Sequence, residues 1–258
     1  MNSVNNSEND NSVNNSVNVN SLNVNSLNNS ENVKFINYTD HFNKFRPLSV
    51  GELYYFLHTY FRDYIDYSSF VVYIKSHGSL HVPRCTFSRK SNNMVHHLRI
   101  LPIFIIDEYS SHYNILIVDN IRNIAERFEP SDSSYDKDLN KLLKMAFRDN
   151  KYRYIHANHN GPQFMEIHEV GATMNCGFWV LLYVQDRLND ISCKQKQFLL
   201  KWMDHIKQNG FHNWISEYKR CVLAICSKNT FSENYICDRI YNRRPLDYYD
   251  YKLNNIVI

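Results

Sequence analysis

Cys176 opens a long apolar run, MNCGFWVLLYVQDRL, and is followed directly by a glycine and two aromatic residues. The apolar residues continue to Leu188 without a breaker, which predicts a mostly buried helix that starts at the cysteine. A helix N-terminus favours an anion, because its free N–H groups and positive dipole end point outward. A nucleophilic cysteine also needs a base and a residue that orients the base.

His112 and Glu129 are the best candidates for those two roles. His112 starts HYNILIVDN, whose continuous run Ile115 to Val118 is typical of a strand buried on both faces, and we place it at the edge of the sheet. Glu129 closes the alternating strand IAERFEP, just before Pro130. If the two strands form a hairpin around residues 119–123, their far ends lie side by side and the carboxylate meets the imidazole.

Further elements are needed to hold these residues. Ser49 and Glu52 form a capping box that predicts a helix over about Val50 to Phe61. The remaining segments are assigned from hydrophobic periodicity. Strands are expected at Phe70–Ile74, His96–Ile106 and Tyr152–Ala157, and helices in the segment of Leu139 to Phe147, at Cys176–Leu188, at Lys194–Gln208 and at Asn213–Cys226.

The arrangement of these elements predicts an α+β fold in which the strands form an antiparallel meander beside a helical half. Residues 1–33 differ from the rest, since they consist of Asn, Ser and single aliphatic residues, and we expect a disordered tail there. Residues 34–258 are then expected to form one domain. The C-terminal stretch YNRRPLDYYDYKLNNIVI has no assigned structure.

Composition excludes several classes of protein. No apolar run approaches the ~20 residues that span a bilayer, and the N-terminus lacks the layout of a signal peptide, so we expect a soluble, intracellular protein that does not bind membranes. Six cysteines in 258 residues are too sparse for a disulfide framework. The net charge of +3 identifies no partner by itself.

In this order the residues resemble the adenain and ubiquitin-like (SUMO) protease superfamily of cysteine peptidases. His112–Tyr113 matches its histidine–aromatic pair, Glu129 its acid, Gln163 in GPQ its oxyanion glutamine, and Cys176–Gly177 its nucleophile. RFEP, the later GPQ and a Cys-headed helix ending in RL resemble a subgroup associated with large DNA viruses and some eukaryotes. The resemblance spans about His96 to Leu188 and implies a papain-like fold in the permuted order of this superfamily.

The resemblance also implies a mechanism and a substrate class. His112 would activate Cys176, Glu129 would orient the imidazole, and Gln163 with the Cys176 N–H would bind the oxyanion. No metal or organic cofactor is implied. The substrate would be a viral or host precursor protein, or a ubiquitin-like conjugate, and cleavage would follow small residues. The protein would act in the cytoplasm or nucleus of a host cell, or in a virion.

Two positions depart from the pattern of the superfamily. The interval from Gln163 to Cys176 is longer than in the better-known members, and Asn175 stands where many of them have Asp. Gln185 lies inside the predicted helix, and Gln195 and Gln197 follow the nucleophile, so Gln163 is the glutamine that best suits the oxyanion role.

Other interpretations of single residues are open. Cys176 could be a small core residue and His112 a structural histidine. Asp119 could replace Glu129 as the acid, although its place after a strand favours a turn cap. The zinc interpretation uses His81, Cys85, His96 and His97, whose spacing fits no common finger. Arg239, Arg243 and Arg244 could contact nucleic acid, but neighbouring aspartates favour a solvated surface.

Two other functions use the same fold. A Cys-dependent acetyltransferase would use a similar order of His, Glu and Cys and would require acetyl-coenzyme A. A binding module would retain the fold without turnover, in which case Cys176 would not react selectively.

Overall fold

The computed structural model describes the residues that surround the predicted site. These are 46–65, 70–87, 97–107, 111–131, 136–156, 161–164, 175–190, 195–209, 218–220, 222–223, 225–226 and 248–253. The chain divides into two units, Met1–Asn32 and Val33–Ile258, and all described residues belong to the second. The tail expected at residues 1–33 lies outside them.

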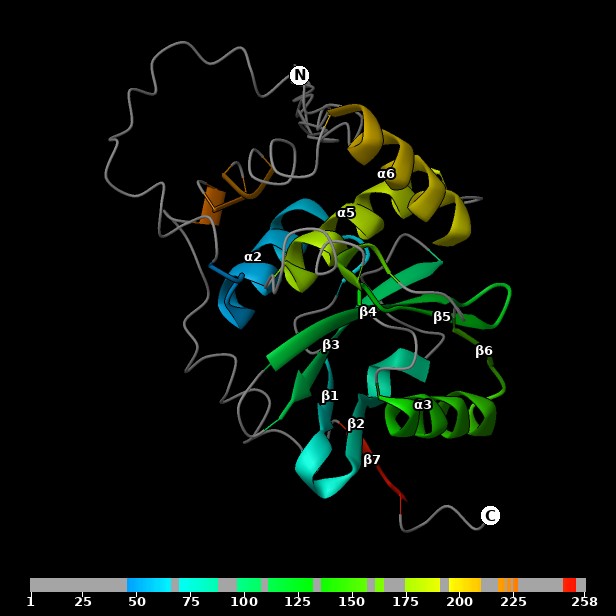
Figure 1. Cartoon of the computed structure of the whole chain (residues 1–258). Helices are drawn as coiled ribbons and strands as arrows, with labels where there is room; N and C mark the ends of the chain where they lie inside the picture. The colour runs from blue at the N-terminus through cyan, green and yellow to red at the C-terminus, as the bar shows by residue number, and fades with distance from the viewer. Residues whose placement is uncertain are drawn as a thin grey trace, which may run out of the picture. The chain divides into compact units, whose positions relative to one another are not determined.

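Seven strands form one curled, mixed sheet (Figure 1). Their spatial order is β6-β5-β4-β3-β1-β2-β7. The strands are β1 (Val71–Ile74), β2 (Ser79–Pro83), β3 (Leu98–Ile106), β4 (Ser111–Asp119), β5 (Ile124–Phe128), β6 (Arg153–His156) and β7 (Tyr248–Lys252). The described chain is therefore α and β mixed, as expected for the coarse class.

The prediction of a purely antiparallel sheet was wrong. β3, β4 and β5 do form an antiparallel meander, but β1 pairs parallel with β3 and β6 pairs parallel with β5. β2 and β7 were not predicted, and they pair with each other antiparallel at the far side of the sheet. Period-2 patterning identifies a strand without identifying its partner, and β7 comes from a polar, tyrosine-rich stretch with no clean alternation.

His112 lies on an interior strand of this sheet. β4 begins at Ser111 and lies between β3 and β5, so His112 is near the end of an interior strand, whereas the sequence had suggested the sheet's edge. It pairs with Ile105 of β3, while Asp119 at the other end of β4 pairs with Ile124. The hairpin expected between β4 and β5 is confirmed.

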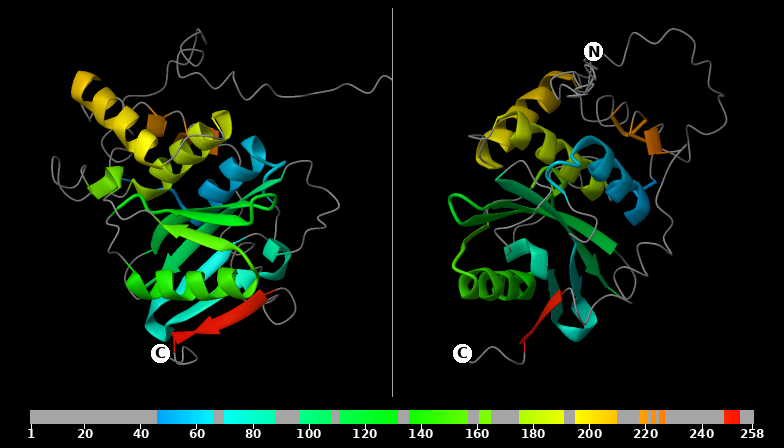
Figure 2. Two further views of the ribbon diagram at one scale, coloured as in Figure 1. Left: turned by 90° about the vertical axis from the view of Figure 1, so that its right-hand side faces the viewer. Right: turned by 180° about the vertical axis from the view of Figure 1, so that it is seen from behind.

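Helices cover both faces of the sheet (Figure 2). On one face lie α2 (Val50–Tyr60), α5 (Cys176–Asn189) and α6 (Gln195–Asn209), and on the other lies α3 (Lys137–Asp149). All four helices were predicted to within a few residues. Of the helix expected at Asn213–Cys226, the described residues 218–220, 222–223 and 225–226 are helical.

Each face has its own hydrophobic core. Alternation along β4 directs Tyr113, Ile115 and Ile117 into the core under α2 and α5, and Leu116 and Val118 into the core over α3. The even-numbered residues of β4 therefore share the α3 side, and His112 and Asn114 belong to this series. His112 therefore lies on the α3 side of the sheet. Because it is close to the end of β4, its side chain can also contact the start of α5.

The N-terminus of α2 is closed by the predicted capping box. The Ser49 hydroxyl accepts from the Glu52 N–H at 3.2 Å, and the Glu52 carboxylate accepts from the Ser49 N–H at 2.8 Å. Arg46 pairs with the same carboxylate at 2.7 Å. This contact orders the chain just before Leu48, which packs against α5 at Gly177.

Phe128 packs the end of β5 against α5 and α6. Its ring stacks on Tyr183 of α5, with centroids 4.1 Å apart and an interplanar angle of 11°, and meets Phe198 of α6 edge-on at 5.4 Å. The Tyr183 hydroxyl donates to Glu126 on the same strand at 2.7 Å. These contacts determine where the chain leaves β5, one residue before Glu129.

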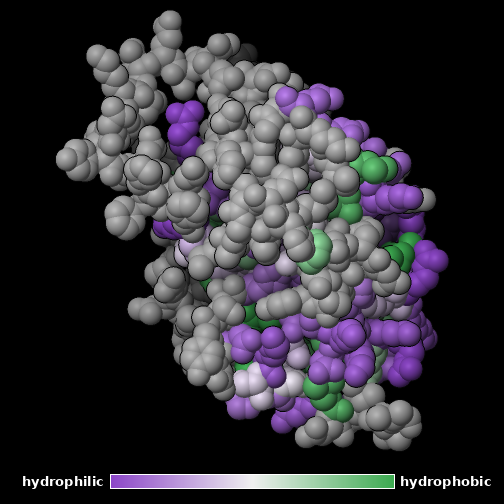
Figure 3. Space-filling view, viewed as in Figure 1, coloured by the Kyte–Doolittle hydropathy of each residue, from purple (hydrophilic) through white to green (hydrophobic). Residues whose placement is uncertain are grey.

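The described surface is mainly polar on the face seen in Figure 3, where apolar side chains are scattered singly. Ile121, Ile155 and Leu200 are the large apolar side chains that are exposed among the described residues. Within the same residues, no helix has the length and apolar character to cross a membrane.

Replacing Phe128 by Ala should lower the free energy of unfolding by about 3–5 kcal/mol, because a buried aromatic residue and its stacking partners are lost. Urea unfolding followed by tryptophan fluorescence measures this. Ile121→Ala, on a side chain that is 71% exposed, is the matched control and should change the stability by less than about 0.5 kcal/mol. Equal effects of the two substitutions would contradict the anchoring role of Phe128.

Candidate active site

His112 and Glu129 are hydrogen bonded although 17 positions separate them in the sequence. Nε2 of the imidazole lies 2.6 Å from Oε1 of the carboxylate. Both side chains are largely buried, with 12% and 9% of their surface exposed. The antiparallel register explains the contact, since Ile115 pairs with Phe128 and the next residues along the two strands continue side by side. This is the juxtaposition that the sequence predicted.

The third residue of the row is Cys176, which interacts with the His112 side chain and raises its pKa. Because Nε2 is occupied by Glu129, Nδ1 is the ring nitrogen that remains to exchange a proton with the thiol. Burial alone lowers the pKa of His112. The charge of Glu129, the hydrogen bonds to Cys176 and Glu129, and the charge on Cys176 outweigh it and raise the pKa from 6.5 to about 10. The imidazole is therefore positively charged at neutral pH.

Cys176 is the first residue of α5, as predicted. Asn175 precedes the helix, and its carbonyl accepts from the Trp179 N–H at 3.1 Å, so the N–H groups of the first turn have no acceptor within the helix. They and the helix dipole favour a negative sulfur atom. Gly177 allows close packing here, because a Cβ at this position would come within 3.3 Å of Leu48 and Tyr113.

Glu129 is kept ionised by three neighbours. Burial raises its pKa, but the charge and hydrogen bond of His112, the charge of Arg127 and the Ser131 N–H lower it below 4.5. Oε1 accepts from Ser131 N at 2.8 Å, and Oε2 pairs with Arg127 Nη2 at 2.8 Å. The carboxylate thus has one oxygen for the imidazole and the other for the guanidinium.

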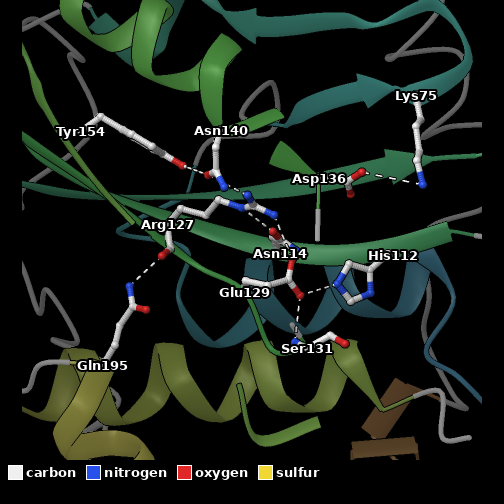
Figure 4. Close-up of polar contacts among 10 residues, drawn as sticks. All are labelled: Lys75, His112, Asn114, Arg127, Glu129, Ser131, Asp136, Asn140, Tyr154 and Gln195. Carbon is white, nitrogen blue, oxygen red and sulfur yellow. Dashed lines mark hydrogen bonds and ion pairs between the residues drawn. The ribbon is translucent and has the colours of Figure 1, made fainter. Parts of the chain in front are cut away.

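Arg127 is itself part of a buried polar network (Figure 4). Its side chain is 2% exposed, Nε donates to Asn114 at 2.5 Å, and Nη1 donates to Asn140 of α3 at 2.8 Å. The Tyr154 hydroxyl of β6 donates to the same Asn140 oxygen at 2.7 Å. From α6, Gln195 donates to the backbone oxygen of Arg127 at 2.6 Å.

Gln163 is positioned through its backbone. It lies in the helical turn 162–164, and its N–H donates to the Pro130 oxygen at 2.7 Å, one residue after Glu129. The Gly161 N–H donates to the Ser131 oxygen at 2.5 Å, so two hydrogen bonds join this turn to the loop of the acid. A Cβ on Gly161 would overlap the Pro130 carbonyl. The structure thus joins the glutamine segment to Glu129, while the oxyanion role of Gln163 stays a prediction.

Asp119 and His81, the alternative acid and one of the alternative zinc ligands, have different partners in the fold. Asp119 Oδ1 accepts from the N–H groups of Ile121 and Arg122 at 3.0 and 2.9 Å, so it caps the turn at the end of β4 away from His112. His81 pairs with Asp250 of β7.

A metal site finds no support in the part of the chain that the structure describes, where no group of three His, Cys, Asp or Glu residues could hold a metal ion. Among the described cysteines, Cys85, Cys176 and Cys226 form no disulfide. His96 of the zinc interpretation and the arginines of the nucleic-acid interpretation lie outside the described residues.

Sequence reasoning missed Arg127 and its partners. A signal was present, because the alternation of β5 puts Arg127 on the same face as Ala125 and Glu129, where a charged residue is unexpected. Asn140 and Gln195 could not be found in this way. They lie on α3 and α6, and no sequence pattern indicates which helix residues contact Arg127 on β5. No protein-family model matches the chain, and no curated protein sequence is significantly similar to it.

The imidazole of His112 should titrate near pH 10 in the folded protein. Replacing Glu129 by Gln should lower the pKa of His112 by roughly one to three units, because the adjacent negative charge is removed. Nitrogen-15 NMR of histidine-labelled protein measures both values, and His112→Ala assigns the signal. His77→Ala, at an exposed position, should leave the His112 transition unchanged.

The same pKa has a consequence for stability. Since the folded value lies above the unfolded value, protonated His112 stabilises the fold fully below about pH 6.5, and this contribution is lost as the pH rises through about 10. If the NMR titration of His112 has its midpoint near pH 6.5 in the folded protein, Glu129 and Cys176 do not keep the imidazole charged above that pH.

Replacing Gly161 by Ala should lower the free energy of unfolding by about 1–3 kcal/mol, because the new methyl group overlaps backbone atoms that carry the Glu129 loop. Gly177→Ala is the matched control. Its methyl group would meet only side-chain atoms at 3.3 Å, and alanine is the better helix former, so the loss should be smaller. Thermal or urea unfolding compares the two, and a larger loss at Gly177 would argue against the tight joint at Gly161.

Proposed function

We propose that this protein is a cysteine peptidase that hydrolyses peptide or isopeptide bonds through Cys176, His112 and Glu129. The observation that carries the proposal is a row of three side chains: a buried carboxylate is hydrogen bonded to an imidazole with a raised pKa, and the imidazole interacts with a thiol at a helix N-terminus. Each member supplies one requirement of thiol catalysis, namely the orienting acid, the base and the nucleophile.

The reaction begins with the pair of thiolate and imidazolium. Sγ of Cys176 attacks the scissile carbonyl carbon, and the negative oxygen that forms faces the free N–H groups at the start of α5. Collapse of this intermediate breaks the C–N bond, and the proton on Nδ1 of His112 passes to the leaving amine. Throughout this step, Nε2–H of His112 donates to Glu129.

Hydrolysis of the thioester regenerates the protein. Neutral His112 takes a proton from water at Nδ1, the resulting hydroxide attacks the acyl carbon, and Cys176 leaves as the thiolate. The carboxamide of Gln163 is proposed to donate a second hydrogen bond to the oxyanion, as the resemblance to the adenain and ubiquitin-like protease superfamily implies. The same resemblance suggests a protein substrate with small residues before the scissile bond.

The proposal is tested by labelling the full chain near neutral pH with a peptide vinyl sulfone that ends in Gly-Gly. Peptide mass spectrometry should find Cys176 modified in preference to the other five cysteines. His112→Ala should reduce the rate by at least about 100-fold, since proton transfer by a positioned base contributes this much. Cys176→Ser should abolish modification at that position, and His77→Ala is the control for loss of an exposed histidine.

Turnover is examined separately with a peptide library, in which new N-termini are identified after incubation with the wild type and with Cys176→Ser. Cleavage that depends on Cys176 and needs no added acyl donor supports a hydrolase. Acylated products that form only when acetyl-coenzyme A is added would replace the proposal by an acetyltransferase. Unselective labelling of Cys176 would reject the catalytic thiol and leave a binding module.

A further inference from the structure

Arg127 stands directly behind the acid of the proposed triad, and its charge completes a buried cluster of four groups. Arg127 pairs with Glu129, Glu129 with His112, and His112 with Cys176. In the thiolate–imidazolium pair of the proposed mechanism, the charges of Arg127, Glu129, His112 and Cys176 are positive, negative, positive and negative, so the cluster is neutral. A cluster without the arginine would carry one uncompensated negative charge in the protein interior, which is costly.

Within this cluster, Arg127 becomes the only partner that compensates the charge of Glu129 once the thioester has formed in the proposed reaction. After His112 has given its proton to the leaving amine, the imidazole and the sulfur atom of the thioester are both neutral. Glu129 is then compensated by Arg127 alone. Without that positive charge, the buried carboxylate would pull the proton back toward His112 and oppose its release.

We propose that Arg127 is a positioning residue that keeps Glu129 ionised and oriented while His112 is neutral, and so allows the imidazole to act as the general acid. This inference rests on the proposed function for the step that it explains. The geometry is specific, because Nη2 donates to Oε2, whereas Oε1 is bound by His112 and the Ser131 N–H. Nε and Nη1 hold the guanidinium in place through Asn114 and Asn140.

Other ionisable groups surround the pair, and none of them replaces Arg127. Asp136 immediately precedes α3 and interacts with Glu129, His112 and Arg127, but burial raises its pKa, and its ion-pair partner is Lys75 at 3.8 Å. Burial also raises the pKa of Tyr154, which is therefore neutral at physiological pH. Apart from His112, Arg127 is the cation among these described neighbours that directly contacts the Glu129 carboxylate.

The test is the pH dependence with which iodoacetamide alkylates Cys176 in the full chain. This reagent requires only a thiolate, so the measurement is independent of whether the protein cleaves peptides. Two variants separate charge from shape. Arg127→Gln keeps an N–H donor but removes the charge, whereas Arg127→Lys keeps the charge but loses the planar fork.

We expect the acid limb of the alkylation profile to move up by roughly one pH unit in Arg127→Gln, because without the buried positive charge Glu129 holds its proton to higher pH and then no longer stabilises the imidazolium that accompanies the thiolate. Arg127→Lys should leave the limb in place. Arg148→Met, which removes an exposed guanidinium on α3, is the matched control. The buried thiol of Cys226 reports folding, since it should stay unlabelled in every variant that is folded.

The outcomes separate this inference from the proposed function. An unmoved limb in folded Arg127→Gln overturns the role of Arg127 even if the wild type cleaves peptides. A moved limb supports it even if no peptide is cleaved. If Arg127→Gln does not fold, Arg127→Lys decides. A limb that moves although the positive charge is retained overturns the role of the charge, and an unmoved limb supports it.

Discussion

A buried carboxylate that is hydrogen bonded to a buried imidazole constrains most of the structure around it. Neither charge is stable in the interior unless a partner compensates it and hydrogen bonds satisfy its remaining atoms. The protein meets this requirement with residues from several directions: Arg127 and the Ser131 N–H on Glu129, and Cys176 on His112. Arg127, Ser131 and Cys176 must in turn be held in position, and the surrounding helices and strands do this.

The two faces of the sheet provide different parts of that support. The α3 face holds the counter-charge, because Asn114 and Asn140 bind the guanidinium between the sheet and the helix. The opposite face holds the nucleophile, because α5 packs there and begins at Cys176. His112 joins the two from the end of β4. A substitution that shifts α3 or α5 is therefore expected to alter the contacts among Glu129, His112 and Cys176.

Local patterns were sufficient to predict the contact between His112 and Glu129. A hairpin of two adjacent strands determines which residues face each other once its turn is located, and the turn after Asp119 was readable from the sequence. The start of α5 followed from an uninterrupted apolar run. The parallel pairing of β1 with β3, the edge strand β7 and the contact of Gln195 with Arg127 could not be predicted, because each joins segments whose proximity is decided only by tertiary packing.

A structural role for the buried charges is the strongest competitor to catalysis, since ion pairs of this kind also occur in proteins without chemistry at that position. The composition of the row argues against it. Arg127 and the Ser131 N–H already compensate Glu129 and occupy acceptor sites on both oxygens. Adding an imidazole, and directing its other side to a cysteine at a helix N-terminus, adds charges that must themselves be compensated. In the proposed function each of these groups has a role, because the thiol exchanges a proton with the imidazole and the carboxylate orients the imidazole.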